Sequence, residues 1–338
     1  MKQINVIILN WNGLNLLKEF LPRVLDTTDL ELSEVIVADN GSTDGSLDYA
    51  RWLGLRTIEF PENHGFAGGY NLALEQSDAP YTILLNSDVA PVAGWDRALF
   101  DYMEAHPRCA ACQPKILSWH DPSKFEYAGA CGGFIDRNGF PYCRGRIFST
   151  VETDNGQYDS PINCDWATGA ALMVRTDLYR SAGGLDTSFF AHMEEIDLCW
   201  RLRLAGHDIA AVPSAAVMHL GGGSLPVGNP KKTYLNFRNN LLLLHKNLPA
   251  ADRSQALTRR RLLDTIAWAK SVATFHFADA RAILKAHRDY RLMAPEAVLS
   301  GADTNLIKNR PNILVSYYLR RLKRFSMLCN IKRANHHD

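Results

Sequence analysis

The sequence predicts an α/β protein in which helices flank a mainly parallel sheet and a helical C-terminal extension follows. Three observations lead to this fold class. Short apolar runs alternate with segments of helical periodicity through the first hundred residues. The apolar runs are continuous, as in strands that are buried on both faces. From residue 231 onward, the chain has helical character almost throughout.

The first hundred residues contain four predicted strands and four predicted helices in strict alternation. The strands are expected at residues 4–9, 34–39, 55–60 and 81–88, and the helices at 13–25, 44–53, 65–77 and 94–106. Right-handed crossovers through such helices make the strands parallel. Ligands of parallel sheets bind beyond the carboxyl ends of the strands. We therefore expect the functional site among the polar residues at these ends: Asn10, Asp39, Asn40, Asn63 and residues 86–88.

After residue 106, the predicted strands and helices no longer alternate regularly. The middle, about 107–175, is rich in glycine, proline, aromatic residues and cysteine, with strands expected at 110–118 and 164–175. A helix across 189–201, a strand at 208–213 and a loop at 219–230 follow. Further helices are expected at 234–247, 253–277 and 313–325. We divide the chain into a main domain of residues 1–250 and a basic helical extension of residues 251–338.

Charge is distributed unevenly along the chain. Residues 251–338 contain 17 Lys/Arg and 7 Asp/Glu, whereas residues 1–250 contain 20 and 29, and the total is only +1. A basic C-terminal region suits an anionic surface, such as phospholipid or a phosphate-bearing lipid carrier. A set of solvated helices would have the same composition. We expect no nucleic acid partner, and the oligomeric state stays open.

The N-terminal stretch indicates the cellular compartment. It reaches Asn10 and Asn12 after one lysine and a short apolar run, so we expect no signal peptide. No window approaches the roughly 18 apolar residues of a spanning helix. We therefore expect a cytoplasmic protein, which the basic region would bring to the inner face of the cytoplasmic membrane.

The seven cysteines are an odd number, and a reducing compartment argues against disulfides. Cys109 and Cys112, with Cys131 and Cys143 downstream, leave a zinc site as a rival interpretation. The later pair lacks the C-x₂-C spacing, so only half of the usual pattern is present.

Two stretches of the first hundred residues suit a nucleotide. In VADNGSTDGS, residues 37–46, Asp44 is placed to accept from backbone N–H groups as a helix cap. Asp39 ends a strand and could accept from a base N–H or a ribose hydroxyl, or could only stabilise the turn. Gly65, Gly68 and Gly69 lie at a loop-to-helix junction, whose backbone N–H groups would suit a diphosphate. The junction matches neither a P-loop nor G-x-G-x-x-G.

Two residues suit a divalent cation. Asp88 follows an apolar run and Asn86 in LLNSDV. Mg²⁺ and Mn²⁺ are typically held by one or two carboxylates together with substrate phosphates. The alternative is that Asp88 caps a turn. His219 precedes the glycines of HLGGGS, which would form a flexible loop over a ligand, and its imidazole favours Mn²⁺ over Mg²⁺. A structural histidine is the alternative there.

The stretch FFAHMEEIDLCWR, residues 189–201, holds the candidate base. Asp197 and Arg201, at i and i+4 on a helix, form a favourable pair that we interpret as structural. Glu194 and Glu195 lie in the first turn, where the helix dipole favours anions. Glu195 lies off the face of Asp197 and Arg201 and has no helical cation beside it, so it is the better candidate for a free base.

These motifs together resemble glycosyltransferase family 2, the inverting sugar-nucleotide transferases with a GT-A fold, and most of all its bacterial rhamnosyltransferase-type branch. The resemblance runs from about residue 3 to residue 247. It rests on VIILNWNG, VIVADNGSTDGS, NHGFAGGYN, LLNSDV, TGAALMVR, FFAHMEEIDLCWRLRLAG, HLGGGS and YLNFRNNLLLLHKN, in this order.

The resemblance implies a Rossmann-like GT-A fold and a metal-dependent hexosyltransferase with Mg²⁺ or Mn²⁺. The donor would be a nucleotide-diphosphate sugar, dTDP-rhamnose or similar, with UDP-sugars as the second choice. The acceptor would be a hydroxyl of a glycan or of a lipid-linked acceptor in bacterial cell-surface polysaccharide synthesis.

The resemblance also implies roles for individual residues. Glu195, next to Glu194, stands at the position of the general base, where the family has Asp. Asn86 replaces the first acid of the family's D-x-D motif, and Asp88 with His219 would hold the metal. Trp166 and Thr168 would face the acceptor. The nucleotide-sugar residues would be Asn10, Asn12, Asp39, Asn40, Ser42, Asn63, Gly65, Gly69, Asn71, Asn86, Ser87 and Asp88.

Two other functions stay open. A glycoside hydrolase also uses paired carboxylates, and it would need neither metal nor nucleotide. A non-catalytic sugar-nucleotide-binding protein would account for the two departures from the motifs, and it would bind UDP or dTDP without turnover.

Overall fold

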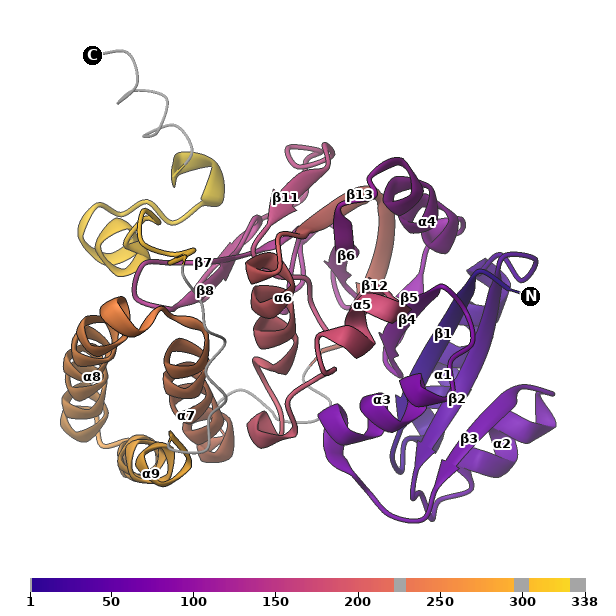
Figure 1. Cartoon of the computed structure of the whole chain (residues 1–338), viewed down its shortest axis with the longest axis horizontal. Coiled ribbons are helices and arrows are strands. Elements are labelled where there is room, and N and C mark those ends of the chain that lie inside the picture. Colours follow the sequence, from indigo (N-terminus) through magenta and orange to yellow (C-terminus); the bar gives the residue numbers. More distant parts are fainter. Residues whose placement is uncertain (1, 222–228, 295–303, 329–338) are drawn as a thin grey trace.

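The computed structural model describes residues 2–221, 229–294 and 304–328 (Figure 1). The first hundred residues fold as predicted, with every strand and helix boundary within two residues of the expected one. The strands are β1 (Ile4–Asn10), β2 (Ser33–Asn40), β3 (Arg56–Phe60) and β4 (Tyr81–Asn86). The helices are α1 (Leu14–Thr27), α2 (Ser46–Trp52), α3 (Gly65–Glu75) and α4 (Trp95–Ala105).

These four strands form the parallel part of the central sheet. β1 lies between β2 and β4 and is parallel to both, and β3 is parallel to β2. The register places Asn10 opposite Asp39 and Leu9 opposite Asn86. Ile7 and Ile8, adjacent on β1, belong to two different hydrophobic clusters, one on each face of the sheet. The continuous apolar runs are therefore explained by burial on both faces.

The second part of the sheet is mixed. β12 runs antiparallel between β4 and β6, and β13 is parallel to β6. β5 pairs with the end of β13 and places Val89 opposite His219. The strand order is β11-β13-β6-β12-β4-β1-β2-β3. These strands are β5 (Val89–Pro91), β6 (Cys109–Ser118), β11 (Ile162–Cys164), β12 (Ala171–Arg175) and β13 (Asp208–His219). The predicted strand at 208–213 thus continues to His219.

The irregular middle contains a small antiparallel sheet that the sequence did not predict. Its strands have two or three residues each, too short for a periodic pattern. They are β7 (Gly133–Ile135), β8 (Pro141–Cys143), β9 (Arg146–Ile147) and β10 (Thr150–Val151). α5 (Thr176–Ser181), the 3₁₀ turn Thr187–Phe189 and α6 (Glu194–Leu204) follow β12.

The C-terminal region is helical, with two differences from the prediction. Its helices are α7 (Pro230–Asn247), α8 (Ala250–Ala273) and α9 (Phe277–Met293). The helix expected at 253–277 ends early because Phe275 has φ +61°. The helix expected at 313–325 is interrupted: residues 313–319 are helical, with a π-helical turn at Val315–Leu319, and helical backbone returns only at Phe325, which packs on Phe134 of the small sheet.

The hydrophobic core continues across residue 250. Leu257 of α8, with Ile313 and Phe325, belongs to the same buried cluster as Trp200 of α6. The helices α7, α8 and α9 contact one another and stand beside the sheet, with α7 between α8 and α6 (Figure 1). The division at residues 250 and 251 stays a prediction.

Candidate active site

The carboxyl ends of β1 and β2 bring three predicted nucleotide-binding residues together. Asn10 Nδ2 donates to Asp39 Oδ1 at 3.4 Å and to Ser42 Oγ at 3.2 Å. Asp39 Oδ2 accepts from the Ser42 N–H at 2.9 Å, so this carboxylate does stabilise the turn. Asn10 and Asp39 are buried. Whether these groups also contact a nucleoside stays a prediction.

The turn after β2 is fixed by two side chains. Asp44 accepts from the Leu14 N–H at 2.9 Å and the Ser46 N–H at 3.0 Å, the first residues of α1 and α2. Asp44 thus accepts from backbone N–H groups as predicted, but it is not the N-cap residue, because the N-cap of α2 is Gly45 and that of α1 is Gly13. Burial opposes ionisation, but the hydrogen bonds from Ser46 and Leu14 lower the pKa of Asp44. Asn12, exposed, accepts from the Thr43 N–H at 2.8 Å.

The glycine junction before α3 is held by amides. Asn40 Oδ1 accepts from the His64 N–H at 2.9 Å, and Asn40 Nδ2 donates to Asn63 Oδ1 at 3.0 Å. Asn63 Oδ1 also accepts from the Gly65 N–H at 2.8 Å. Gly65 has φ +72°, and a Cβ on Gly69 would lie 2.7 Å from Leu9. Both glycines are thus explained by backbone conformation and close packing, and their contact with a diphosphate stays a prediction.

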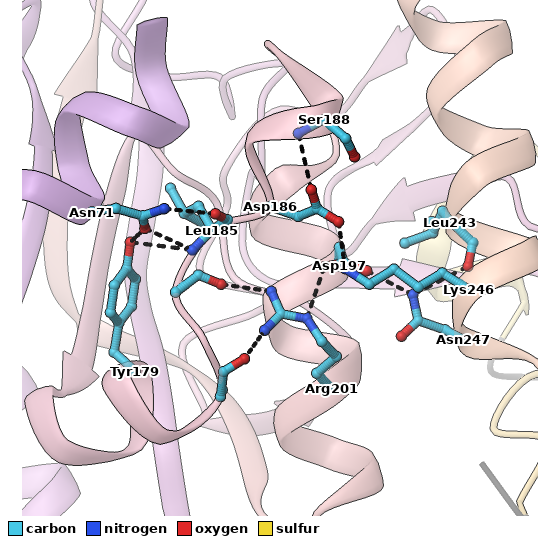
Figure 2. Close-up of polar contacts among 12 residues, drawn as sticks. Asn71, Tyr179, Leu185, Asp186, Ser188, Asp197, Arg201, Leu243, Lys246 and Asn247 are labelled. Carbon is cyan, nitrogen blue, oxygen red and sulfur yellow. Dashed lines mark hydrogen bonds and ion pairs between the residues drawn. The ribbon is translucent and has the colours of Figure 1, made fainter. Parts of the chain in front are cut away.

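Asn71 has a structural role that the sequence did not suggest. Its Nδ2 donates to the Leu185 carbonyl at 2.8 Å, and its Oδ1 accepts from Tyr179 Oη at 2.6 Å and the Leu185 N–H at 2.9 Å (Figure 2). The carboxamide therefore joins α3 to the segment that leads to α6. Its contact with the ribose or diphosphate, implied by the resemblance, stays a prediction.

The predicted metal ligands meet at the end of β4. His219 Nε2 lies 3.2 Å from Asp88 Oδ1, and 3.5 Å from Asn86 Nδ2. His219 Nδ1 lies 3.3 Å from Glu126 Oε2 on its other side. Burial opposes protonation, but the neighbouring carboxylates of Asp88 and Glu126 raise the pKa of His219 to about 9. Asp88 and His219 therefore lie next to each other, and their role as metal ligands stays a prediction.

This set of atoms fits a divalent cation. Metal-binding histidines commonly donate their second ring N–H to a carboxylate, as Nδ1 can do here to Glu126. Asp88 would then offer an oxygen, and His219 would offer an imidazole nitrogen once a cation displaces its Nε2 proton; such ligands suit Mn²⁺. Within residues 2–221, 229–294 and 304–328, no group of three or more His, Cys, Asp or Glu side chains is arranged to hold a metal. Other ligands would come from the donor phosphates.

The candidate base lies at the start of α6, after an unusual loop. Phe190, His192 and Met193 have φ of +66°, +69° and +77°, which explains why α6 begins at Glu194 and not at residue 189. Positive φ at such residues is costly and is frequent at functional sites. The three positive φ angles within four residues therefore mark this turn as a candidate functional site, a feature with no signal in the sequence pattern.

The two glutamates of this turn differ in their surroundings. Glu194 is 4% exposed, and its Oε2 has no hydrogen-bond partner among the described residues. Glu195 is more exposed and lies beside Gly169, where an added Cβ would be 3.9 Å from Glu195 Cβ. Burial raises the pKa of Glu195 to about 7. Burial, and then the neighbouring Glu195, raise the pKa of Glu194 well above its usual range.

Two residues of α7 hold the loop before the base. Asn239 Nδ2 lies within 3.0 Å of three carbonyl oxygens of the loop, those of Phe189, Ala191 and His192. Arg238 Nη2 donates to the Phe189 carbonyl at 2.7 Å. Asn239 is fully buried. We had assigned no role to these residues, although an Arg-Asn-Asn run before four leucines was a visible signal.

The predicted pair of Asp197 and Arg201 is confirmed as structural. Arg201 Nε donates to Asp197 Oδ2 at 2.8 Å, and Lys246 Nζ reaches the same oxygen at 2.8 Å (Figure 2). Asn247 Nδ2 donates to Asp197 Oδ1 at 2.8 Å, and Lys246 also pairs with Asp186 at 2.6 Å. Asp197 is completely buried. These contacts fix α6 against α7, and they leave Glu195 outside the network.

Comparison with known proteins identifies the family. Residues 5–159 match the model of Glycosyl transferase family 2. The N-acetylglucosaminyl-diphospho-decaprenol L-rhamnosyltransferase of Mycobacterium tuberculosis (strain ATCC 25618 / H37Rv) is 31% identical over 223 residues, which are 60% of this chain and 71% of that protein. The chain belongs to glycosyltransferase family 2. The resemblance to its rhamnosyltransferase-like branch is thereby confirmed.

Solved structures confirm the fold of this glycosyltransferase. The mannosyltransferase PcManGT from Pyrobaculum calidifontis, in complex with GDP-Man and Mn²⁺, has a TM-score of 0.52 at 15% identity, covering 92% of this chain and 89% of that chain. GalNAc-T7 with UDP, GalNAc and Mn²⁺ has a TM-score of 0.56 at 14% identity, covering 72% and 48%. The predicted GT-A fold is confirmed.

The predicted acceptor residues of the glycosyltransferase are buried. Trp166 packs directly on Gly133, and its Nε1 donates to the Phe134 carbonyl at 3.1 Å. Thr168 is 3% exposed, and its Oγ1 accepts from the Ala170 N–H at 3.3 Å. Thr168 thus stabilises the turn that carries Gly169 beside Glu195. Contact with an acceptor stays a prediction.

The cysteines that had left a zinc site open lie in the core. The described cysteines are free and buried, and burial raises the pKa of Cys109 to about 12. A thiol with a raised pKa is a poor metal ligand and a poor nucleophile. The structure therefore gives the zinc interpretation no support.

Proposed function

We propose that this glycosyltransferase transfers a sugar with inversion from a nucleotide-diphosphate donor to a hydroxyl of a lipid-linked glycan. The observation that carries the proposal is the turn beside Glu195: Gly169 lies against Glu195, and the carbonyl of Ala170 accepts at 3.0 Å from the N–H of Asn86, two residues before Asp88. Burial raises the pKa of Glu195 to about 7. A base with a pKa near the operating pH is the most effective one. Glu195 and Asp88 thus have different surroundings and different proposed tasks: Glu195 is the base, and Asp88 is a metal ligand.

In the proposed reaction, the Glu195 carboxylate accepts the proton of the acceptor hydroxyl. The acceptor oxygen attacks the anomeric carbon from the face opposite the diphosphate, and the bond from that carbon to the phosphate oxygen breaks. The products are an inverted glycoside and a nucleoside diphosphate. Asp88 and His219 would hold Mn²⁺ or Mg²⁺, which neutralises negative charge on the leaving diphosphate when it is bound.

The donor is proposed from the relatives. The mycobacterial relative is named as an L-rhamnosyltransferase, which favours dTDP-rhamnose, and UDP-sugars are the second choice. The same name describes an acceptor in which N-acetylglucosamine is joined to a lipid through a diphosphate. We propose an acceptor of this class, used in cell-surface polysaccharide synthesis.

The test is a panel of nucleotide sugars. Melting temperatures are measured with dTDP, UDP and GDP, each with and without Mn²⁺, and turnover is then measured with the matching sugars and an N-acetylglucosaminyl diphospholipid. We expect Mn²⁺-dependent stabilisation by one nucleotide and turnover of its sugar. Stabilisation without turnover would favour the non-catalytic binding protein, and absence of both would contradict the proposal.

We also propose that the reaction takes place at the cytoplasmic face of the membrane. The support is the excess of 17 basic over 7 acidic residues in residues 251–338, together with a lipid-linked acceptor. No described helix combines the length and the apolar character needed to span a bilayer. Deleting residues 251–338 is a poor test, because Leu257, Ile313 and Phe325 are part of the core.

A further inference from the structure

Helix α9 has an outer side that its packing leaves exposed. Its inner side packs on α7 and α8 through buried residues such as Ile283 and Tyr290. Away from this inner side, Phe275, in the turn before α9, is 80% exposed. Within α9, Phe277 is 52% exposed and Leu284 is 56% exposed. We use the name α9 outer face for three apolar and three basic residues: Phe275, Phe277, Leu284, Arg281, Lys285 and Arg288.

The charge of the α9 outer face is positive. Arg281, Lys285 and Arg288 are exposed, while the acids of α9 lie toward its neighbours. Asp279 accepts from Thr233 of α7 at 2.7 Å, and Asp289 accepts from Tyr234 Oη at 2.9 Å. Arg288 and Lys285 both pair with Asp289, at 2.9 and 4.0 Å, but their side chains remain 70% and 57% exposed.

The α9 outer face lies near the candidate active site. The Thr233–Asp279 hydrogen bond joins the first turn of α9 to the first turn of α7. Lys231, in the same turn of α7, has its Nζ 4.8 Å from the ring centre of Phe190, in the loop before the base. In Figure 1, α9 lies at the lower end of the helical bundle, below α7 and α8. A surface bound by α9 would therefore be close to the loop that precedes Glu195.

We propose that the α9 outer face binds the surface of an anionic bilayer. Phe275, Phe277 and Leu284 would enter the boundary between head groups and acyl chains, while the three basic residues contact lipid phosphates. A helix face that mixes aromatic, aliphatic and basic residues is typical of such interfacial binding. This inference deepens the proposed function, from which it takes the lipid-linked acceptor.

A second copy of the chain fits this face less well. In a two-fold symmetric interface the same patch meets itself, so Arg281, Lys285 and Arg288 would face identical cations. A bilayer that contains acidic lipids supplies the opposite charge. Electrostatic complementarity therefore selects the bilayer as the partner.

The experiment is co-sedimentation of the full chain with vesicles, without sugar nucleotide. Vesicles of phosphatidylcholine alone are compared with vesicles that also contain phosphatidylglycerol. We expect binding only to the acidic vesicles and weaker binding at high salt. The double variant R281Q/R288Q should bind about 25-fold more weakly, because each basic residue contributes about fivefold. The double variant F275S/F277S should lose at least about tenfold.

The matched controls are exposed residues on α1 and α2, the helices that flank the central sheet. Trp52→Ser removes a 78% exposed aromatic side chain from α2, and Lys18→Gln removes an exposed charge from α1. Both should leave vesicle binding unchanged. Equal binding by all variants would overturn the proposal, as would a chain that stays in the supernatant with acidic vesicles. A dimer in solution that R281Q/R288Q or F275S/F277S dissociates would assign the face to a second copy.

The result is separable from the proposed chemistry. Vesicle binding needs no donor or acceptor, so an inactive enzyme that binds acidic vesicles would contradict only the proposed function. An active enzyme whose variants bind vesicles like the unmodified chain would contradict only this inference. Thermal unfolding of each variant verifies that the exposed substitutions leave the fold intact.

Discussion

The proposed site has a donor side and a base side, and different kinds of contact hold them. On the donor side, Asn10, Asp39 and Ser42 hydrogen-bond to one another across two adjacent strands and the turn that follows. On the base side, the loop before Glu195 is held by Arg238 and Asn239, which come 49 and 50 residues after the Phe189 carbonyl that both contact. This part of the donor side thus depends on two paired strands and the turn after them, and the base side depends on a helix outside the sheet.

The difference shows where the site is vulnerable. Phe190, His192 and Met193 have positive φ, and each such residue costs on the order of 1–3 kcal/mol. Hydrogen bonds from α7 offset that cost and keep the carbonyl groups satisfied. Helix α7 lies outside residues 5–159, the part that matches the family model. The position of the base is therefore expected to depend on residues that the family match does not include.

The largest effect is expected from Glu195→Gln. Loss of a general base reduces turnover by about 10²- to 10⁴-fold. The isosteric amide keeps the side chain in place, so the dissociation constant of the nucleoside diphosphate should stay near normal. Turnover is measured by product formation and donor binding by calorimetry. Turnover equal to that of the unmodified enzyme would remove Glu195 from the role of base.

Asp88→Asn is expected to cause a large loss of metal-dependent donor binding. The substitution removes the carboxylate that faces His219 at 3.2 Å, so donor binding should lose its response to Mn²⁺. Glu126→Gln should have a smaller effect, about 10- to 100-fold in Mn²⁺ affinity, because Glu126 acts through His219. Mn²⁺ titrations of donor binding measure both. An unchanged response in Asp88→Asn would contradict the metal site.

Asn239→Ala tests the base side directly. The variant removes the Asn239 donor from the partly buried Ala191 and His192 carbonyl groups, while Arg238 still donates to the Phe189 carbonyl. An unsatisfied group of this kind costs about 1–3 kcal/mol in stability. We expect turnover to fall by about tenfold or more while donor affinity is retained. Asn236→Ala, at a partly exposed position of the same helix, is the matched control. Equal losses of donor affinity and turnover would show that the two sides are not separate.

The pH dependence of turnover is the next expected effect. Burial raises the pKa of Glu195 to about 7, and only the carboxylate accepts a proton. Turnover should therefore rise with pH, be half-maximal near pH 7 and fall about tenfold for each unit below. The midpoint belongs to the pair with Glu194, because the two groups interact. A rate that is constant from pH 5 to 7 would contradict this assignment.

The fold was predictable where a periodic pattern could form. The four parallel strands and their helices follow from apolar runs, but β7–β10 are too short to have a pattern. The break at Phe275 and the packing of Phe325 on the small sheet also have no local signal, because distant contacts decide them.

The same distinction between local pattern and distant contacts determines which site residues could be predicted. Asn10, Asp39 and Asp88 could be predicted because the carboxyl ends of parallel strands meet at one edge. The prediction that His219 and Asp88 share one metal site came from the family resemblance. Glu126, Arg238 and Asn239 were missed, because their contacts join residues far apart in the chain. Sequence reasoning therefore predicted the donor side better than the supports of the base.

The smallest effect is expected from Ser42→Ala on the donor side. Ser42 Oγ accepts from the Asn10 side chain at 3.2 Å and from the Asn12 N–H at 2.9 Å, and its surroundings are partly exposed. A hydrogen bond of this kind contributes about 0.5–1.5 kcal/mol, and water can replace it where solvent reaches. Donor affinity should fall by no more than about tenfold, and turnover at saturating donor should not change. If Ser42→Ala lowered turnover as much as Asn239→Ala, the donor side would also position the base, and the two sides would act as one unit.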